Sequence, residues 1–181
     1  SSSGKSTTIY AALHEILHLQ KHTINIVSIE DPVEFAMDRI AQIQVNPHAD
    51  LTFTTALRSI LRQDPEVIVV GEIRDFETAK MAIQAGLTGH LVISTIHSGT
   101  AAGVVTRLID MGIEPFLVAS SITGVLAQRL IRLNCPDCTE EYTPDPLMMH
   151  YFGLTAESGP FYKGAGCKEC QNIGYRSRAG I

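Results

Sequence analysis

The first residues of the chain contain half of a phosphate-binding motif. Gly4, Lys5 and Ser6 stand in the run SSSGKSTT, whereas the complete motif, G-x-x-x-x-G-K-[ST], needs a glycine that would precede Ser1. Backbone N–H groups at the start of a helix bind anions, Lys5 would reach the β- and γ-phosphates of a nucleotide, and the Ser6 hydroxyl would ligate Mg²⁺. A flexible linker is the alternative, but the helical pattern that begins directly after Ser6 favours a phosphate loop.

Acidic residues follow two apolar runs, INIVSIE (24–30) and PEVIVVGE (65–72). Ligands of open α/β sheets bind beyond the carboxyl ends of the strands, which is where Glu34 and Glu72 would lie. A nucleotide hydrolase needs one carboxylate near Mg²⁺ and another that orients or deprotonates water. Any one of these acids alone is more often a turn or solvated residue, but both strand ends together, downstream of Gly-Lys-Ser, favour a nucleotide site.

Two histidines bracket the run HLVISTIH, His90 at its start and His97 at its end. Side chains alternate along a strand, so these two would point to opposite faces and would not easily ligate one metal together. His97, at the carboxyl end, could reach the γ-phosphate of a nucleotide. A hydrogen-bonded structural histidine is the alternative for either residue.

The four cysteines form two C-x-x-C pairs, Cys135/Cys138 and Cys167/Cys170. Without a secretory signal, this arrangement favours a metal over disulfides. Four thiolates would close a tetrahedral structural zinc site with no open position for chemistry. Two unrelated redox pairs are the alternative. The intervening stretch of 28 residues is longer than the ~15–20 of a compact zinc ribbon, so we expect an elaborated loop.

Strands must alternate with helices to bring these residues together. Apolar β-branched runs predict strands, and apolar residues at helical spacing predict helices, the helix after Asp75 being capped by that residue. The expected strands are 24–30, 65–72 and 90–97, and the expected helices 6–20, 54–62, the segment after Asp75, 101–111 and 115–133. This pattern predicts an α/β fold with a parallel sheet covered on both faces. From about Leu133, frequent Pro and Gly and the cysteines indicate a small separate excursion.

Composition and charge narrow the class of protein. The 181 residues suffice for one substantial core, and 45% hydrophobic with 18% charged residues is ordinary for a globular chain. A net charge of −5 disfavours a nucleic-acid binder that relies on phosphate contacts. No run approaches the ~18 apolar residues of a membrane span.

Taken together, the motifs resemble those of the secretion ATPase family, and more closely the assembly ATPases of type II secretion systems and type IV pili. The resemblance covers nearly the whole chain, and the matching segments occur in the family's order. They are SSGKSTT, IVSIEDPVEF, LRSILRQDPEVIVVGEIRD, AGLTGHLVISTIHSGTAAGVVTRLIDMGIEPFLVASS and LAQRLIRLNCPDC. In the family EDPVEF is the Asp box, VIVVGEIRD the Walker B segment and TGHLVISTIH the His box. Gly71 stands where many other P-loop enzymes have Asp, which is itself a family feature.

The resemblance implies roles for particular residues. Glu34 would be the catalytic base, Glu72 the Walker B acid near Mg²⁺, and His97 the sensor of the γ-phosphate. The residues expected to bind ATP are Ser2, Ser3, Gly4, Lys5, Ser6, Thr7 and His90. Ser6 would also ligate Mg²⁺, and zinc would be held by Cys135, Cys138, Cys167 and Cys170.

It also implies an organisation and a function. We expect a RecA-like P-loop core in residues 1–133 that begins within the phosphate loop, a tetracysteine zinc subdomain in 134–175, and a return to the core in 176–181. The protein would be a cytoplasmic ATPase, a homo-hexamer peripheral to the bacterial inner membrane. It would act there with a membrane platform protein and a cytoplasmic-face adaptor to assemble pseudopili or type IV pili.

Departures from the family pattern and rival functions remain. The first P-loop glycine and the N-terminal domain are not in the sequence, so this segment should hydrolyse ATP poorly. The IHSGT sequence after the His box differs from the family's commoner Thr-Asn-Asp-Ala continuation, and Ser177 stands where Gly is commoner. The alternatives are a zinc-dependent nucleic-acid-binding module, which the acidic charge disfavours, and a DNA-translocating relative, which the paired cysteines disfavour.

Overall fold

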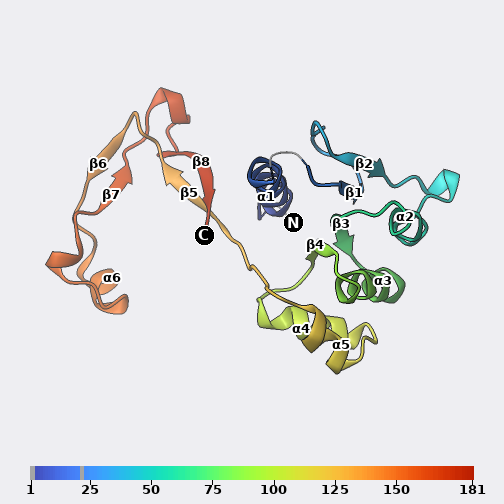
Figure 1. Ribbon diagram of the computed structural model, residues 1–181. Helices are drawn as coiled ribbons and strands as arrows, with labels where there is room; N and C mark the ends of the chain where they lie inside the picture. Colours follow the sequence, from blue (N-terminus) through green and yellow to red (C-terminus); the bar gives the residue numbers. More distant parts are fainter. Residues whose placement is uncertain (1–2, 21–22) are drawn as a thin grey trace. The chain divides into compact units, whose positions relative to one another are not determined.

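A computed structural model describes residues 3–20 and 23–181 of the chain (Figure 1). Contacts divide these residues into two compact units. One is Lys5–Ala127, and the other is Gln128–Ile181 together with the N-terminal residues up to Gly4. The division falls earlier than residue 133, where the sequence suggested a domain boundary. Each unit is described below by itself.

The Lys5–Ala127 unit is built on a parallel sheet of four strands in the order β2-β1-β3-β4. The strands are β1 (Ile26–Glu30), β2 (Ala41–Gln44), β3 (Val67–Ile73) and β4 (Leu91–Ile96). The central strands β1 and β3 are almost continuously buried, as their apolar β-branched runs predict. The predicted α/β fold with a parallel sheet is therefore confirmed. Strand β2 was not predicted, because its sequence AQIQ is short and half polar.

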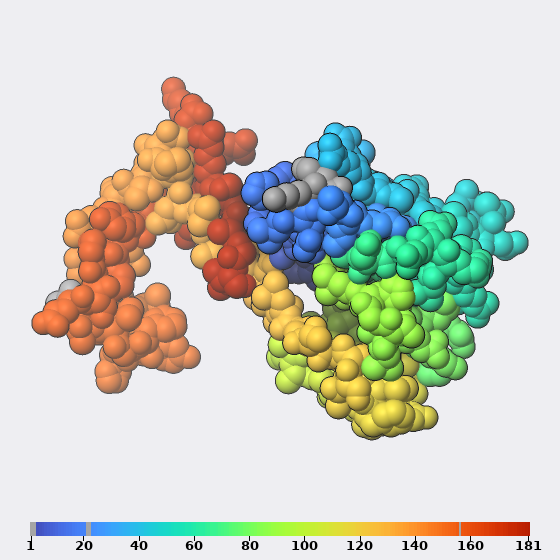
Figure 2. All heavy atoms as spheres, viewed as in Figure 1, coloured from blue at the N-terminus to red at the C-terminus, as the bar shows by residue number. Residues whose placement is uncertain are grey.

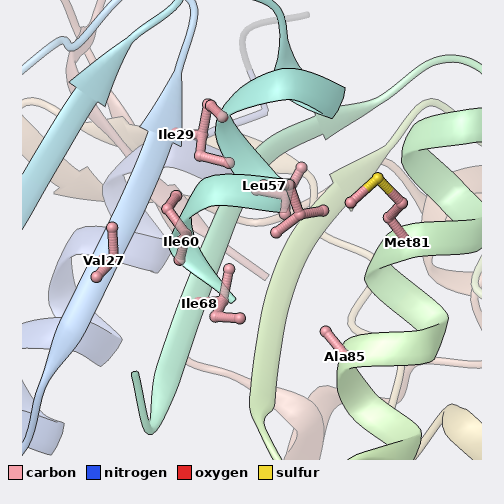
Figure 3. Packing of buried hydrophobic residues seen from close by; sticks show 9 residues of the cluster. Val27, Ile29, Leu57, Ile60, Ile68, Met81 and Ala85 are labelled. Carbon is pink, nitrogen blue, oxygen red and sulfur yellow. The ribbon is translucent and has the colours of Figure 1, made fainter. Parts of the chain in front are cut away.

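Helices cover both faces of this sheet. Helix α1 (Lys5–Leu19) packs Leu13 and Leu17 on one face, against residues of β1 and β3 that include Val69. Helices α2 (Phe53–Ile60) and α3 (Phe76–Leu87) cover the other face. Figure 3 shows this second cluster, in which Leu57 of α2 and Met81 of α3 lie over the strands. The predicted cap of α3 is present, since Asp75 accepts a hydrogen bond from the Thr78 N–H.

The remaining helices extend this core beyond α3. Helices α4 (Ala102–Asp110) and α5 (Pro115–Ser121) pack Leu108 and Val118 against the outer side of α3, and the yellow atoms of α5 are seen below the green atoms of α3 in Figure 2. The prediction of one helix over 115–133 is wrong. Ile122 is already extended, and the end of the predicted segment is instead a strand that pairs with a distant one. A short 3-10 helix, Pro47–Ala49, precedes α2.

The unit of Gln128–Ile181 consists of two small antiparallel pairs of strands. Strand β5 (Leu130–Asn134) pairs with β8 (Tyr175–Gly180), and β6 (Thr139–Glu141) pairs with β7 (Tyr162–Gly164). Helix α6 (Pro146–Tyr151) and the 3-10 helices Ala156–Ser158 and Lys168–Cys170 fill the connections. Gly164 and Gly174 touch backbone to backbone: a Cβ at Gly164 would lie 1.8 Å from the Gly174 carbonyl oxygen. Within the described residues, no helix is long and apolar enough to cross a bilayer.

Candidate nucleotide site and metal centre

The phosphate-binding end of the candidate site is the start of α1. The helix begins at Lys5, so its first N–H groups have no partner within the helix and point towards any anion bound there. Gly4 has a φ of +84°, a backbone conformation that is costly for any residue with a side chain. The Ser3 carbonyl accepts a hydrogen bond from Gln128 Nε2 at 2.9 Å. Thr7 is exposed in the first turn of the helix. Ser2 lies outside the described residues.

Ser6 brings the first of the predicted carboxylates to this helix end. Its hydroxyl donates to Oε1 of Glu34 at 3.1 Å, although the two residues are 28 positions apart. Glu34 lies between β1 and β2 and is exposed. The structure thus places a solvent-accessible carboxylate beside the hydroxyl predicted to ligate Mg²⁺.

The second carboxylate, Glu72, lies near the carboxyl end of β3 and pairs with Arg74. Its Oε2 is 2.8 Å from Nε and 2.7 Å from Nη2 of Arg74. This hydrogen bond lowers the pKa of Glu72 from its usual value, and electrostatic interactions with Lys5 and His97 lower it further, against the effect of burial. Glu72 is therefore ionised at neutral pH and lies within electrostatic reach of both Lys5 and His97.

The backbone around Glu72 explains the glycine that precedes it. A Cβ at Gly71 would lie 3.1 Å from the carbonyl oxygen of Ile29 on the neighbouring strand, so a larger residue there would push β1 and β3 apart. On the other side, the ladder between β3 and β4 is irregular after Val70. The hydroxyl of Thr95 donates to the Gly71 carbonyl at 2.8 Å and holds the two strands together there.

The two histidines that flank β4 lie at its opposite ends. His97 directly follows β4, at the same edge of the sheet as Glu72. His90 precedes β4, and its Nδ1 bonds the Ala85 carbonyl at 2.9 Å at the end of α3. His90 is thus separated from His97 by the length of β4, and its expected place among the ATP-binding residues stays a prediction. Its bond to Ala85 is also the kind of contact that a structural histidine makes.

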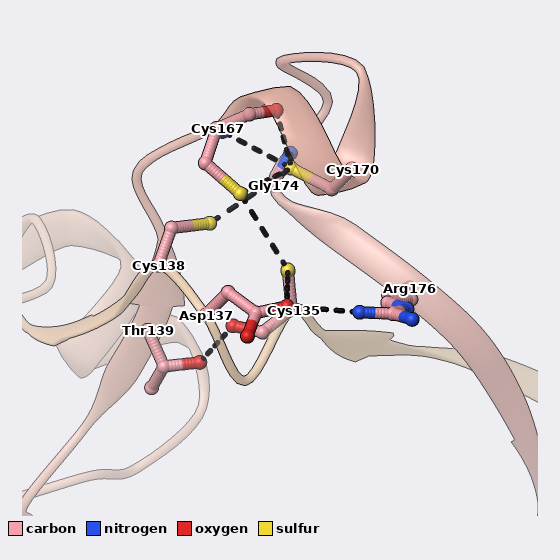
Figure 4. Close-up of polar contacts among 8 residues, drawn as sticks. All are labelled: Cys135, Asp137, Cys138, Thr139, Cys167, Cys170, Gly174 and Arg176. Atoms are coloured by element: carbon pink, nitrogen blue, oxygen red, sulfur yellow. Dashed lines mark hydrogen bonds and ion pairs between the residues drawn. The ribbon is translucent and has the colours of Figure 1, made fainter.

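The four cysteines of the second unit converge on one point (Figure 4). All four Sγ atoms lie within 4.8 Å of one another, and the cysteines are free rather than disulfide-bonded. The Sγ atoms of Cys135 and Cys167 are 3.9 Å apart, as are those of Cys138 and Cys170, and Cys167 and Cys170 are at 3.7 Å. A tetrahedral ion with metal–sulfur bonds of about 2.3 Å requires sulfur separations of about 3.8 Å. The donor set therefore fits a metal of that geometry.

Backbone N–H groups around the cluster favour negative sulfur on one side of it. Those of Cys167 and Gly174 donate to Cys170 Sγ at 3.2 and 3.3 Å, and that of Gly166 donates to Cys138 Sγ at 3.3 Å. Donation from Cys167 lowers the pKa of Cys170 to about 6, whereas burial raises that of Cys135 to about 12 and also raises that of Cys138. A cation at the centre would offset the cost of ionising the buried thiols.

Polar contacts also fix the strands that carry the cysteines. The guanidinium of Arg176 on β8 pairs with Asp137, between the first two cysteines, at 2.9 Å. The Thr139 hydroxyl donates to the Cys135 carbonyl at 2.6 Å. The Arg176–Asp137 pair joins the loop of the first two cysteines to the strand that follows the second two, and the Thr139 bond closes that loop.

Sequence reasoning missed three side chains around the candidate catalytic groups. Tyr10 bonds the Glu34 N–H, Arg74 bonds the Glu72 carboxylate, and Gln42 bonds the backbone of Phe35 beside Glu34. Tyr10 had a signal, since it stands four residues after Ser6 and must share its face of the helix. Arg74 follows Glu72 by two positions, a spacing that places both on one face of a strand. Gln42 had none, because the strand that carries it was not predicted.

Comparisons with known proteins agree with this geometry. The profile of the family described as "Type II/IV secretion system protein" matches residues 1–181. The type II secretion system ATPase E of Vibrio cholerae is 56% identical over 180 residues, which are 99% of this chain and 35% of that protein. The type IV pilus assembly ATPase PilB of Thermus thermophilus is 50% identical over 182 residues, 99% of this chain and 20% of that protein. The chain thus spans about a third or less of these relatives.

Solved structures show the same fold. The pilus retraction motor PilT with bound ADP matches with a TM-score of 0.60 and 37% identity, over 72% of this chain and 40% of that one. The ATPase DotB of Legionella pneumophila matches with a TM-score of 0.58 and 28% identity, over 75% of this chain and 39% of that one. With the family profile matching over its whole length, the chain belongs to the type II/IV secretion system protein family.

Proposed function

We propose that this chain is the nucleotide-binding part of a cytoplasmic ATPase motor that drives assembly of pseudopili or type IV pili, for protein secretion or pilus extension. The observation that carries the proposal is the contact of Ser6 with Glu34 at the start of α1. It joins a helix end suited to phosphate with a carboxylate able to act on water. Relatives named type II secretion ATPase E and pilus assembly ATPase PilB support the assignment.

Each residue of the site then has a task. Lys5 and the N–H groups at the start of α1 hold the phosphates of ATP, and Gly4 allows the backbone to approach them. Ser6 ligates Mg²⁺, which would offset phosphate charge when bound. Glu34 accepts a proton from the attacking water. Glu72, kept ionised by Arg74, supports the metal from the end of β3, while His97 at the end of β4 contacts the γ-phosphate.

We further propose that Cys135, Cys138, Cys167 and Cys170 bind one zinc ion. The spacing of their sulfur atoms suits zinc, and four thiolates leave no position for substrate, so the role of the site is structural. The alternative of a nucleic-acid-binding zinc module has no observation in its favour, because acidic and basic residues are equal in number over residues 128–181.

The partners follow from the same assignment. The motor would be a homo-hexamer that binds an inner-membrane platform protein and a cytoplasmic adaptor, and so would be peripheral to the bacterial inner membrane. One solved relative is a pilus retraction motor and another is an ATPase, which supports a motor of this kind.

A test of the catalytic assignment is Glu34→Gln, which keeps the side-chain shape and removes the base. Because the chain spans about a third of its curated relatives, hydrolysis is measured with the chain carried in a protein of their length. We expect ATP binding to persist and the turnover rate to fall by about 10²–10⁴, whereas Lys5→Ala loses binding. Glu15→Gln, on the exposed side of α1, is the matched control and should retain the parent rate. Hydrolysis by Glu34→Gln at that rate would remove Glu34 as the base.

A further inference from the structure

The loop that carries Glu34 contains neither helix nor strand. It runs through residues 31–40, between β1 and β2, and is called the Glu34 loop below. Most of its residues are exposed, and its apolar contacts with the core are made after Glu34, by Met37 and Ile40. The distance of 3.1 Å between Glu34 and Ser6 therefore depends on whatever else holds the loop.

Tyr10, on α1, holds two consecutive amides of this loop. The N–H groups of Glu34 and Phe35 donate to its hydroxyl at 3.2 and 3.4 Å. The same hydroxyl donates its proton to Oε2 of Glu30. A phenol offers one donor and two acceptor lone pairs, and all three are used here. The Tyr10 ring also meets the Phe35 ring edge-on, with centroids 6.3 Å apart.

Glu30 is the fixed point to which Tyr10 is tied. It ends β1 and is only 8% exposed. Besides Tyr10, its carboxylate accepts the Ser28 hydroxyl at 2.6 Å and Gln42 Nε2 at 3.0 Å. A buried carboxylate with three donors is held rigidly, so the Tyr10 hydroxyl has one favoured position.

Strand β2 holds the loop from its other side. Gln42 Nε2 also donates to the Phe35 carbonyl at 3.0 Å, and Gln42 Oε1 accepts the Met37 N–H at 2.7 Å. Gln44 Oε1 accepts the Val33 N–H at 3.2 Å. Side chains of α1 and β2 therefore bind the loop backbone on both sides of Glu34.

We propose that Tyr10 and Gln42 are positioning residues for Glu34, which hold its loop so that its carboxylate lies at the phosphate-binding end of α1. This inference rests on the proposed function for its catalytic consequence. Tyr10 lies on the same helix as Lys5 and Ser6, one turn later. Tyr10 therefore ties the Glu34 loop to the helix that carries the phosphate-binding end, while Gln42 ties the same loop to the sheet.

The ionisation of Tyr10 agrees with this role. Burial raises the pKa of the Tyr10 hydroxyl from its usual value, and the hydrogen bond to Glu30 raises it further, against the effect of the two loop amides. The hydroxyl thus remains protonated at working pH and can donate to Glu30 while it accepts from the loop.

The test is Tyr10→Phe, which removes the hydroxyl and keeps the ring beside Phe35. We expect the amides of Glu34 and Phe35 to exchange with solvent at least about fivefold faster by NMR, since they lose their acceptor. We also expect kcat for ATP to fall about tenfold with KM within about twofold, because a displaced base slows the chemical step without weakening nucleotide binding. Gln42→Met, which removes the second holder, should accelerate exchange of the Met37 amide and lower kcat in the same way. Tyr151→Phe, at an 82% exposed tyrosine, is the matched control and should change neither quantity.

The outcomes separate this inference from the function on which it rests. Unchanged amide exchange in both folded variants would overturn it, and so would an unchanged kcat in a parent protein that hydrolyses ATP. If the parent binds and hydrolyses no ATP, the proposed function fails and the amide exchange alone decides whether Tyr10 and Gln42 hold the loop. If Tyr10→Phe does not fold, Gln42→Met gives the same two readouts.

Discussion

Removal of the metal should unfold residues 128–181 and leave the parallel-sheet unit folded. The reason is the composition of the smaller unit's interior. Among its residues whose burial is described, the buried side chains are Cys135, Pro144 and Cys170. The other unit has three clusters of buried aliphatic residues. In the smaller unit, the cysteine cluster takes the place of a hydrophobic core.

The magnitude follows from the geometry of the cluster. Sulfur separations of 3.7 to 3.9 Å are those of a closed tetrahedral site, whose zinc contributes about 10–16 kcal/mol in small zinc-dependent folds. A whole domain is stable by only about 5–15 kcal/mol. The free energy lost when the ion is removed, or when Cys167→Ser removes one of its ligands, therefore exceeds the stabilisation that the few buried side chains of this unit can supply.

The assay combines metal analysis with segment-resolved hydrogen exchange. The purified protein should contain one zinc per chain, and treatment with a strong chelator should abolish protection of β5 to β8 while that of β1 and β3 persists. Cys167→Ser should behave like the chelated protein. Met148→Ser, which removes a sulfur atom from a 52% exposed side chain of the same unit, should keep both metal and protection. A metal-free sample with protected β5 and β8 would refute the reasoning.

Three further predictions concern stability and charge. Leu57→Ala, at a fully buried position between α2 and the sheet, should lower the free energy of unfolding by about 2–5 kcal/mol in urea titrations, a loss that exposed Leu19→Ala should not show. Gly164→Ala should prevent pairing of β6 with β7, because its Cβ would meet the Gly174 carbonyl at 1.8 Å. The control Gly86→Ala, with open space around the new Cβ, should be neutral or should stabilise the fold by up to about 1 kcal/mol. Thermal unfolding followed by circular dichroism compares the two variants. Arg74 lowers the pKa of Glu72 from its usual value. This pair therefore stabilises the fold above the unfolded-state pKa, and its contribution is lost as the pH falls through the lowered value. Carboxyl NMR titration should show the Glu72 pKa rising in Arg74→Gln, and an unchanged value would mean that another group holds it down.

Much of the sheet could be predicted, because the local sequence of its central strands is enough to identify them. Val67 to Val70 are apolar and β-branched in an unbroken run, and such a run is stable only when both of its faces are covered. Helices α1 and α3 likewise carry their apolar residues at helical spacing, and Asp75 marks the start of α3. The cap and the periodicity act over a few residues, so no distant partner is needed to recognise them.

The errors occur where a distant partner decides the conformation. Residues 130–134 have a helical pattern but form β5, because β8 supplies a strand partner from more than 40 positions along the chain. Strand β2 forms because it pairs with β1, and the sequence AQIQ contains no feature that predicts this pairing.

The amino-acid order thus establishes which chemical groups are present and which short segments carry them: a lysine and a serine opening a helix, carboxylates after apolar strands, and thiols in pairs. Their meeting in space follows from long-range contacts. Parallel pairing of β1 with β3 brings the carboxyl ends of both strands to one edge, and the pairing of β5 with β8 and β6 with β7 brings Cys135 and Cys138 to Cys167 and Cys170. Side-chain chemistry is a property of single residues, whereas hydrogen-bond ladders and buried contacts join residues far apart in the chain, and the sequence read locally carries no record of those distances.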